Sequence, residues 1–299
     1  MRVLLLGANG QVGTELRRSL VPLGEVVAAT RTGSLADGDA CEVADFDLPA
    51  SLPRLIERIG PDVVVNAAAY TAVDRAESEQ EAAWRANAEA PSAIAAACEA
   101  RGAWLVHYST DYVFDGTATR PYREDDPTSP LGVYGASKLA GEEAIRSSGV
   151  RHLILRTAWV YAAHGKNFLL TMLRLAKERD QLRVVADQVG TPTSAALIAD
   201  TTARLLTSPE ACGTWHLTAS GETTWHGFAE AIFSGARDRG MLTRTPQLDA
   251  IATSDYPTPA RRPAYSVLDN SLLSRDFDLR LPRWEHGLQD VLGGMGDLG

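Results

Sequence analysis

A glycine-rich turn directly after the first apolar segment constrains the fold more than any other feature of the sequence. Val3–Leu6 has the composition of a short buried strand, and Gly7-Ala8-Asn9-Gly10-Gln11-Val12-Gly13 follows it and opens a helical pattern. Glycines at such a junction permit a tight turn and close approach of the backbone to a diphosphate. The following helix N-terminus offers free N–H groups and a partial positive charge. The turn therefore predicts a dinucleotide site at Gly7, Gly10, Gln11, Val12 and Gly13.

Short apolar segments alternate with helical patterns through the first half of the chain. Strand-like segments lie at Val3–Leu6, Val26–Ala29, Val63–Asn66, Trp104–His107 and His152–Leu155, and helical patterns at Gln11–Leu20, Leu52–Ile59, Glu79–Arg101 and Tyr134–Ser147. Strands and helices in this order build parallel βαβ units. The predicted fold class is α/β, with a Rossmann-type doubly wound parallel sheet.

The end of the second strand carries Thr30 and Arg31. A site for NAD places a carboxylate there for the ribose 2′-hydroxyl, whereas an arginine can pair with a 2′-phosphate. Thr30 and Arg31 therefore favour NADPH over NADH. The alternative is that Arg31 is a solvated loop residue.

Beyond Thr157 the alternation gives way to helical patterns separated by segments rich in Pro, Thr and Arg. They lie at Asn167–Arg179, Ala195–Leu206 and Trp225–Asp238. This change predicts a smaller, discontinuous substrate-binding lobe. We expect residues 1–158 to form an NADP(H)-binding Rossmann domain to which 194–220 returns, and residues 159–193 and 221–299 to form the lobe.

The composition excludes several classes of protein. The 299 residues carry 29 Lys and Arg against 38 Asp and Glu, so the chain is acidic and no nucleic-acid partner is expected. Three widely spaced cysteines and unpaired histidines predict neither a disulfide framework nor a metal site. No apolar segment approaches the ~20 residues of a membrane span, and no signal peptide is visible. We expect no membrane partner and a cytoplasmic location.

Tyr134 and Lys138 stand four residues apart in a helical pattern and therefore share one face of a helix. A neighbouring ammonium lowers the pKa of a phenol and makes it usable for proton transfer near neutrality. The chain has only three lysines against 26 arginines, and a compact ammonium reaches a phenol as a guanidinium does not. The pair predicts proton transfer at a carbonyl group.

A further polar residue is expected where His107-Tyr108-Ser109-Thr110-Asp111 leaves the fourth strand. Doubly wound folds bind ligands at the carboxyl ends of their strands. Side chains alternate between faces, so either Ser109 or Thr110 faces the substrate. Thr110 is the choice that a family resemblance supports.

The motifs above occur together with Asn66-Ala67-Ala68-Ala69, Ser109 to Phe114, Arg156 to Tyr161 and Asp187 to Thr193. In combination they resemble the extended short-chain dehydrogenase/reductase family over nearly the whole chain. Within that family the chain is similar to reductases of sugar nucleotides. The resemblance implies an NADPH-dependent 4-ketoreductase that converts dTDP-4-dehydro-6-deoxy-L-mannose to dTDP-L-rhamnose.

The resemblance also implies roles for individual residues. Its catalytic set corresponds to Thr110, Tyr134 and Lys138, with Tyr134 as the proton donor. Its cofactor contacts correspond to Gly10, Gln11, Val12, Asp45, Phe46, Ala69, Tyr70, Thr71, Tyr134 and Lys138. Its contacts to the sugar nucleotide correspond to Val73, Thr110, Asp111, Tyr112, Tyr134 and Trp159.

Several alternatives stay open at this point. A dehydratase is disfavoured because Asp111 is followed by Tyr112 where that subfamily carries Glu. A 4-ketoreductase of another nucleotide-linked deoxysugar, as in antibiotic glycoside pathways, fits the same motifs. A non-catalytic regulatory subunit on the same fold is disfavoured by the intact catalytic set. The resemblance keeps NADH as the second coenzyme, Mg²⁺ as a candidate ion and a homodimer as the candidate assembly.

Overall fold

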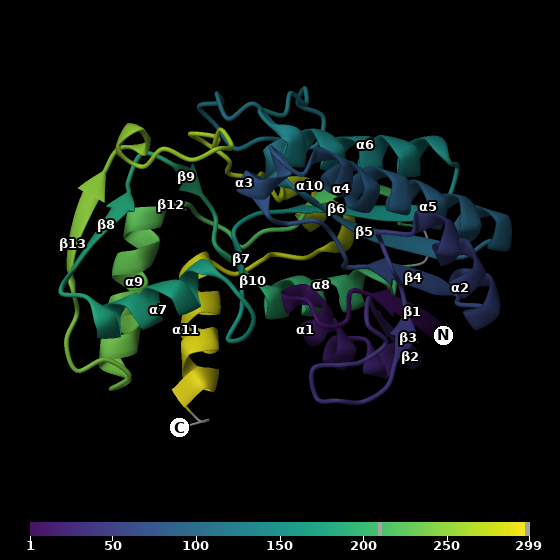
Figure 1. Ribbon diagram of the computed structural model, residues 1–299, viewed down its shortest axis with the longest axis horizontal. Coiled ribbons are helices and arrows are strands. Elements are labelled where there is room, and N and C mark those ends of the chain that lie inside the picture. The colour runs from purple at the N-terminus through teal and green to yellow at the C-terminus, as the bar shows by residue number, and fades with distance from the viewer. Residues whose placement is uncertain (209–210, 297–299) are drawn as a thin grey trace.

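A seven-stranded parallel sheet forms the centre of the computed structural model, which describes residues 1–208 and 211–296 (Figure 1). The strand order is β11-β6-β5-β4-β1-β2-β3. Because the order reverses between β1 and β4, a ligand crevice is expected at the carboxyl ends of these two strands. The predicted fold class is confirmed. The strands are β1 Arg2–Leu6, β2 Glu25–Thr30, β3 Glu42–Val43, β4 Val63–Asn66, β5 Trp104–Thr110, β6 His152–Thr157 and β11 Gly213–His216.

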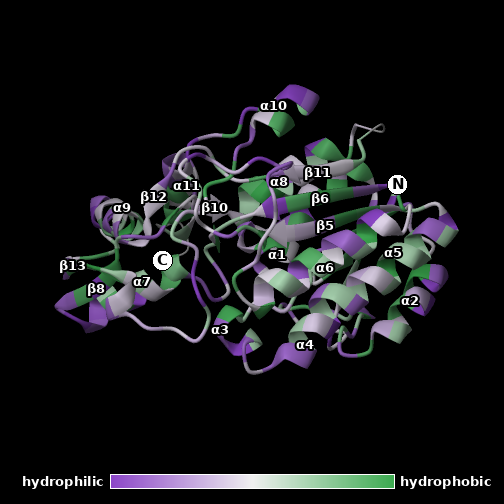
Figure 2. Ribbon diagram, turned by 90° about the horizontal axis from the view of Figure 1, so that it is seen from above, coloured by the Kyte–Doolittle hydropathy of each residue, from purple (hydrophilic) through white to green (hydrophobic). Residues whose placement is uncertain are grey.

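Helices cover both faces of this sheet, which explains why its strands are apolar almost throughout (Figure 2). Consecutive residues of β1 point to opposite faces. Val3 and Leu5 pack with Leu16 of α1 (Gln11–Ser19) and with α8 (Ala195–Leu205). Leu4 and Leu6 pack on the other face. The helices of that second face are α2 Leu52–Ile59, α5 Ala90–Arg101 and α6 Val133–Ser147.

A smaller lobe lies beside the sheet and has its own apolar core (Figure 1). Its helices are α7 Phe168–Glu178, α9 Trp225–Asp238 and α11 Trp284–Gly296, and its parallel strand pair is β8 Gln181–Val185 with β13 Gln247–Ile251. Asn167 and Thr224 cap α7 and α9 by accepting hydrogen bonds from the backbone N–H groups of Leu170 and Gly227.

Short elements complete the chain. There are two small strand pairs. In one, β7 Val160–Tyr161 pairs with β10 Thr193–Ser194, and in the other, β9 Val189–Gly190 pairs with β12 Thr223–Thr224. The remaining helices are α3 Val73–Ala76, α4 Gln80–Trp84 and α10 Ser271–Phe277, with 3-10 turns at Val21–Leu23, Pro49–Ser51, Asp111–Val113 and Thr253–Asp255. No helix in the described part of the chain is long and apolar enough to cross a bilayer.

The structure differs from the sequence prediction in several places. The single helix expected over Glu79–Arg101 is broken by a π-helical segment, Arg85–Glu89, between α4 and α5. The elements that were not predicted are strand β3, all strands from β7 to β13, and the helices α3, α10 and α11. Leu273 and Leu279, inside the expected lobe range 221–299, pack instead against the sheet. Residues 297–299 of that range lie outside the described residues.

Candidate active site

The glycine turn lies where the sheet order reverses. Gly7 has φ 82°, and a Cβ there would lie 2.7 Å from the backbone nitrogen of Ala68. A Cβ at Gly13 would collide with the carbonyl oxygen of Gly7. Gly10 caps α1 without a side-chain hydrogen bond, so the first N–H groups of the helix face outward. This cradle fits a diphosphate, because only glycines allow the backbone so close to a ligand.

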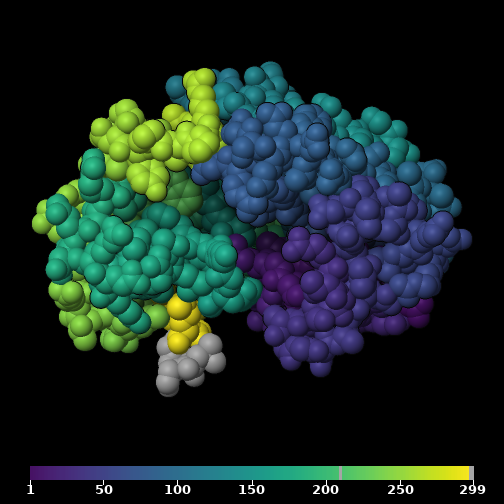
Figure 3. Space-filling model, viewed as in Figure 1, coloured from purple at the N-terminus to yellow at the C-terminus, as the bar shows by residue number. Residues whose placement is uncertain are grey.

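A cavity of about 700 Å³ extends from this turn to the predicted tyrosine and lysine. The space-filling view shows the hollow between the two lobes (Figure 3). Gly13 and Asp45 are absent from its lining, because Gly13 packs beneath the turn and the Asp45 carboxylate accepts from the backbone of Asp47. The predicted cofactor residues that line it are Gly7, Gly10, Gln11, Val12, Thr30, Arg31, Phe46, Ala69, Tyr70, Thr71, Tyr134 and Lys138.

Tyr134 lies in the first turn of α6 and lines the inner end of the cavity. Burial raises the pKa of its phenol well above the ordinary value, and a hydrogen bond with Thr110 opposes that shift only in part. Lys138 is not among the groups that shift this pKa, contrary to the expectation that its charge lowers it. A phenol with a raised pKa stays protonated, so Tyr134 holds a proton to give, although it is a weaker acid than a free phenol.

Lys138 is 1% exposed and lies one turn further along α6. Its Nζ donates to the backbone carbonyl of Tyr108 at 2.6 Å and lies 3.2 Å from Nε2 of His107. Nδ1 of His107 in turn lies 3.1 Å from Nδ2 of Asn66. Burial lowers the pKa of Lys138 to about 8. The ammonium is therefore held against β5, and Asn66 of β4 holds His107 in turn.

Thr110 ends β5, and its hydroxyl has a single hydrogen. It donates that hydrogen to Asp111 Oδ1 at 2.9 Å and accepts from the backbone N–H of Tyr112 at 3.2 Å. Burial raises the pKa of Asp111 to about 6. Polarising a carbonyl would require the Thr110 hydroxyl to turn away from Asp111. Ser109, the competing candidate, lines the cavity, whereas Thr110 is not among the lining residues.

One of the predicted substrate residues, Tyr112, contacts Tyr134, and a second, Val73, is linked to Tyr112 through Arg262 and Asp74. The rings of Tyr112 and Tyr134 meet edge to face with centroids 5.5 Å apart. Arg262 donates to the Tyr112 hydroxyl at 2.9 Å and to Asp74 Oδ2 at 2.6 Å. Because Asp74 follows Val73 in α3, these contacts bring the smaller lobe against Val73 and Tyr112.

Trp159, the remaining predicted substrate residue, has the unusual φ of 47° for a non-glycine residue. Its ring stacks on Trp225 with centroids 3.5 Å apart and an interplanar angle of 4°. The indole also lies close to Gly190, where a Cβ would lie 2.6 Å from the indole Nε1. Trp159 therefore sits in a slot between α9 and β9, outside the lining of the cofactor cavity.

Asn87, in the π-helical segment, was missed by sequence reasoning. It is fully buried, and its side chain accepts from Tyr70 N at 2.9 Å and donates to Tyr70 O at 3.0 Å and to Ser137 Oγ at 3.1 Å. Asn87 thus ties the turn after β4 to the helix that carries Tyr134. Its partners lie 17 and 50 residues away, so no local pattern could indicate it.

Metal ligation has no support among the residues that the structure describes. In residues 1–208 and 211–296 no group of three or more His, Cys, Asp or Glu side chains could hold an ion. Nothing in this site therefore argues for Mg²⁺.

The doubly wound sheet, the glycine turn and the juxtaposed Thr110, Tyr134 and Lys138 define the class, an extended short-chain dehydrogenase/reductase. Comparison with known proteins is more specific. The family profile described as "RmlD substrate binding domain" matches residues 1–296. The dTDP-4-dehydrorhamnose reductase of Salmonella typhimurium is 50% identical over 296 residues, which cover 98% of this chain and 97% of that protein.

Solved structures agree. A dTDP-4-dehydrorhamnose reductase from Clostridium acetobutylicum superposes with a TM-score of 0.89 at 36% identity and covers 99% of both chains. The enzyme of that name from Bacillus anthracis, solved with NADP, has a TM-score of 0.89 at 34% identity and covers 98% of this chain and 99% of its own. The chain belongs to the dTDP-4-dehydrorhamnose reductase family, which confirms the resemblance seen in the sequence.

Proposed function

We propose that this protein reduces the C4 keto group of dTDP-4-dehydro-6-deoxy-L-mannose and forms dTDP-L-rhamnose, with NADPH as the reductant. The observation that carries the proposal is the position of the Tyr134 phenol. The phenol lies next to Thr110, its raised pKa keeps it protonated, and it lines the same cavity as the glycine turn. Relatives with the reductase name at about 50% identity over the whole chain support the choice of substrate.

The residues present fit a nicotinamide dinucleotide. Gly7 and Gly13 leave no room for a Cβ, so the backbone around Gly10, Gln11 and Val12 is free to hold the diphosphate. When bound, the coenzyme supplies the hydride for the carbonyl carbon. Lys138 lines the same cavity and has an ammonium that can hold the ribose.

The protein's own groups complete the reduction. As negative charge develops on the carbonyl oxygen, Tyr134 donates its phenolic proton to that oxygen. The Lys138 ammonium, one helical turn away, does not shift the pKa of Tyr134 in the structure, so its proposed role is to approach and stabilise the phenolate once substrate and coenzyme are bound. Thr110 orients the carbonyl, and its hydroxyl hydrogen turns from Asp111 toward the substrate as the charge appears. Val73, Asp111, Tyr112 and Trp159 are proposed to contact the sugar nucleotide.

The decisive assay follows NADPH oxidation with and without the keto sugar nucleotide. We expect oxidation only when both are present. Tyr134→Phe should lower kcat by several orders of magnitude with little change in coenzyme affinity. The matched control is Tyr256→Phe, since Tyr256 is 61% exposed and should turn over normally. Normal turnover by Tyr134→Phe would refute the proposed chemistry, and turnover only of another 4-keto sugar nucleotide would refute the substrate.

Coenzyme preference forms a separate part of the proposal. Arg31 is exposed, lines the cavity beside Thr30, and takes part in no ion pair among the described residues, so it is available for a 2′-phosphate. We expect a higher kcat/KM with NADPH than with NADH, and an Arg31→Ala variant in which the two values converge. A wild-type kcat/KM that favours NADH would refute this preference.

A further inference from the structure

A loop of the smaller lobe reaches across to the glycine turn. The strap, residues 162–167, connects β7 to α7 and lies against the start of α1. Asn167 Nδ2 donates to Gln11 Oε1 at 2.7 Å, and His164 Nε2 lies 3.0 Å from Glu15 Oε1. A Cβ at Gly165 would lie 3.1 Å from Cγ of Gln11. The strap therefore packs directly on the helix whose N-terminus faces the diphosphate position.

The strap is held in shape by Asn167. Besides Gln11, its Nδ2 lies 2.9 Å from the carbonyl oxygen of Ala162 and 3.1 Å from that of His164, so two hydrogens are shared among three acceptors, while its Oδ1 caps α7. Leu169, two residues further, is fully buried in the core of the smaller lobe. The strap is thus connected, through Asn167 and the first turn of α7, to the apolar core of the smaller lobe.

Lys166 is the only lysine or arginine of the strap. It lines the cavity together with Gly10, Gln11 and Val12, but approaches from the other lobe. No ion pair found in residues 1–208 and 211–296 involves it, so its ammonium is free for a ligand. The chain places one of its three lysines at this point.

We propose that Lys166 binds the diphosphate of the dinucleotide from the side opposite to the glycine turn, so that coenzyme binding holds the smaller lobe against α1. The inference rests on the proposed function, because it needs a dinucleotide in the cavity. The glycine turn can give the diphosphate only backbone N–H groups and a partial charge. A compact ammonium on the other side supplies a full positive charge to the same group.

Binding measurements with the full chain test the contact. Dissociation constants for NADPH and NADH are measured by titration calorimetry for the wild type, Lys166→Ala, Lys166→Arg and Lys177→Ala. Lys177 is an exposed lysine of α7 and serves as the matched control. We expect Lys166→Ala to raise both dissociation constants by the same factor, about 3- to 30-fold. Lys166→Arg should retain most of the affinity, and Lys177→Ala all of it.

The outcomes separate the two proposals. A wild type that binds neither dinucleotide would overturn the proposed function and this inference with it. Binding by the wild type with an unchanged dissociation constant in Lys166→Ala would overturn the inference alone. A loss confined to NADPH would assign Lys166 to the 2′-phosphate and overturn its contact with the diphosphate.

Amide hydrogen exchange tests the coupling between coenzyme and lobe. Saturating NADPH should slow exchange in the strap and the first turn of α7 in the wild type, and much less in Lys166→Ala at equal saturation. Equal protection in both proteins would overturn the coupling, whatever the dissociation constants show.

Discussion

Nζ of Lys138 lies 3.2 Å from Nε2 of His107, and both groups are almost completely buried. Burial lowers the pKa of Lys138 to about 8, and burial together with the nearby lysine lowers the pKa of His107. The neutral imidazole thus gives the ammonium a polar neighbour without a compensating charge. Keeping Lys138 charged in this buried setting lowers the free energy of unfolding, and the size of this effect depends on pH.

The first prediction concerns stability against pH. The unfolded chain keeps Lys138 protonated up to about pH 10.4, whereas the folded chain releases that proton near pH 8. Between these values the unfolded state binds more protons, so the free energy of unfolding rises with pH. Relative to Lys138→Met, the wild type should gain about 3 kcal/mol between pH 7 and pH 10.5. Urea unfolding of both proteins at the two pH values measures this difference.

Lys177→Met is the control for that experiment. Because Lys177 is exposed, the free energies of unfolding of Lys177→Met and the wild type should differ by the same amount at both pH values. If the Lys138→Met and wild-type stabilities changed in parallel with pH, Lys138 would have an ordinary pKa in the folded chain.

A second prediction decides between the two hydroxyls at the end of β5. Thr110→Val removes a donor to Asp111 and an acceptor for Tyr112 N–H, and leaves Tyr134 without its neighbouring hydroxyl. We expect kcat to fall by about 10²- to 10³-fold. Thr110→Ser keeps both hydrogen bonds and should retain most of the activity. Ser109→Ala should stay within a few-fold of the wild type, and a larger loss there than in Thr110→Val would reverse the assignment.

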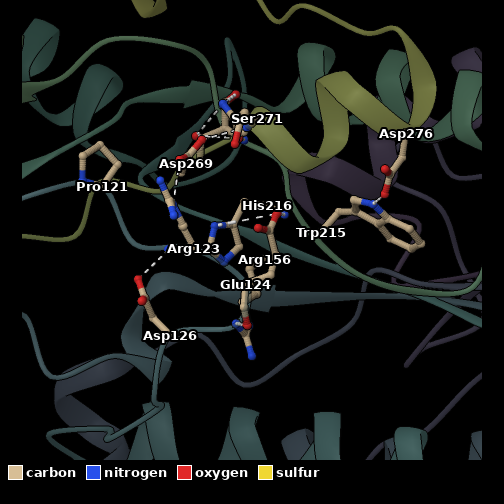
Figure 4. Close-up of polar contacts among 12 residues, drawn as sticks. Pro121, Arg123, Glu124, Asp126, Arg156, Trp215, His216, Asp269, Ser271 and Asp276 are labelled. Carbon is tan, nitrogen blue, oxygen red and sulfur yellow. Dashed lines mark hydrogen bonds and ion pairs between the residues drawn. The ribbon is translucent and has the colours of Figure 1, made fainter.

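A third prediction concerns the buried ion pair behind the catalytic helix. Arg156 donates to both carboxylate oxygens of Glu142, at 2.9 and 2.7 Å, and the two side chains are 3% and 0% exposed. Burial alone would raise the pKa of Glu142, but the hydrogen bonds from Arg156 lower it. Figure 4 shows Arg156 beside Glu124 and His216, and its Nη1 also donates to the Glu124 carbonyl at 3.3 Å.

Arg156→Met should therefore destabilise the fold by about 3–5 kcal/mol, because the half-exposed Arg146 is then the remaining cation paired with the buried Glu142 carboxylate. Replacing both residues, as Glu142→Leu with Arg156→Met, should recover most of that loss. Arg146→Ala should cost less than about 1 kcal/mol. Urea unfolding compares the four proteins. A double variant no more stable than Arg156→Met would show that the pair acts through packing and not through charge.

The parts of the site that the sequence predicted depend on local spacing. The glycine turn and the pair Tyr134 and Lys138 are defined within seven residues, and helical or strand geometry then determines where they lie. Ser137 and His107 show the limit of that reasoning. Ser137 accepts a hydrogen bond from Asn87, and His107 lies next to Lys138, and in each case the two residues are 30 or more positions apart in the sequence. Such contacts can be predicted only once the sheet order is known.

The missed elements have physical causes of their own. Pro91 has no N–H group to donate to the carbonyl of Asn87 one helical turn earlier, and the chain accommodates this with the π-helical segment Arg85–Glu89. The pattern over Glu79–Arg101 remains helical throughout, so it cannot reveal the break. Strand β11, Gly-Thr-Trp-His, is short and half polar, and becomes a strand by pairing with the buried β6.

The last prediction concerns the slot that holds Trp159. The indole is fixed between Trp225 and Gly190, and its backbone adopts a positive φ that bulky residues rarely tolerate. Gly190→Ala would put a methyl group into the ring, so either the ring or β9 must move. We expect a loss of about 1–3 kcal/mol in stability and a raised KM for the sugar nucleotide, with coenzyme affinity unchanged.

The same substitution at Gly294 in α11, where a Cβ meets no atom within 4 Å, should instead stabilise the fold by about 0.5–1 kcal/mol. Thermal unfolding of the two variants measures the opposite changes in stability, and steady-state kinetics measures the change in KM. An unchanged KM in a folded Gly190→Ala protein would remove Trp159 from the proposed substrate contacts.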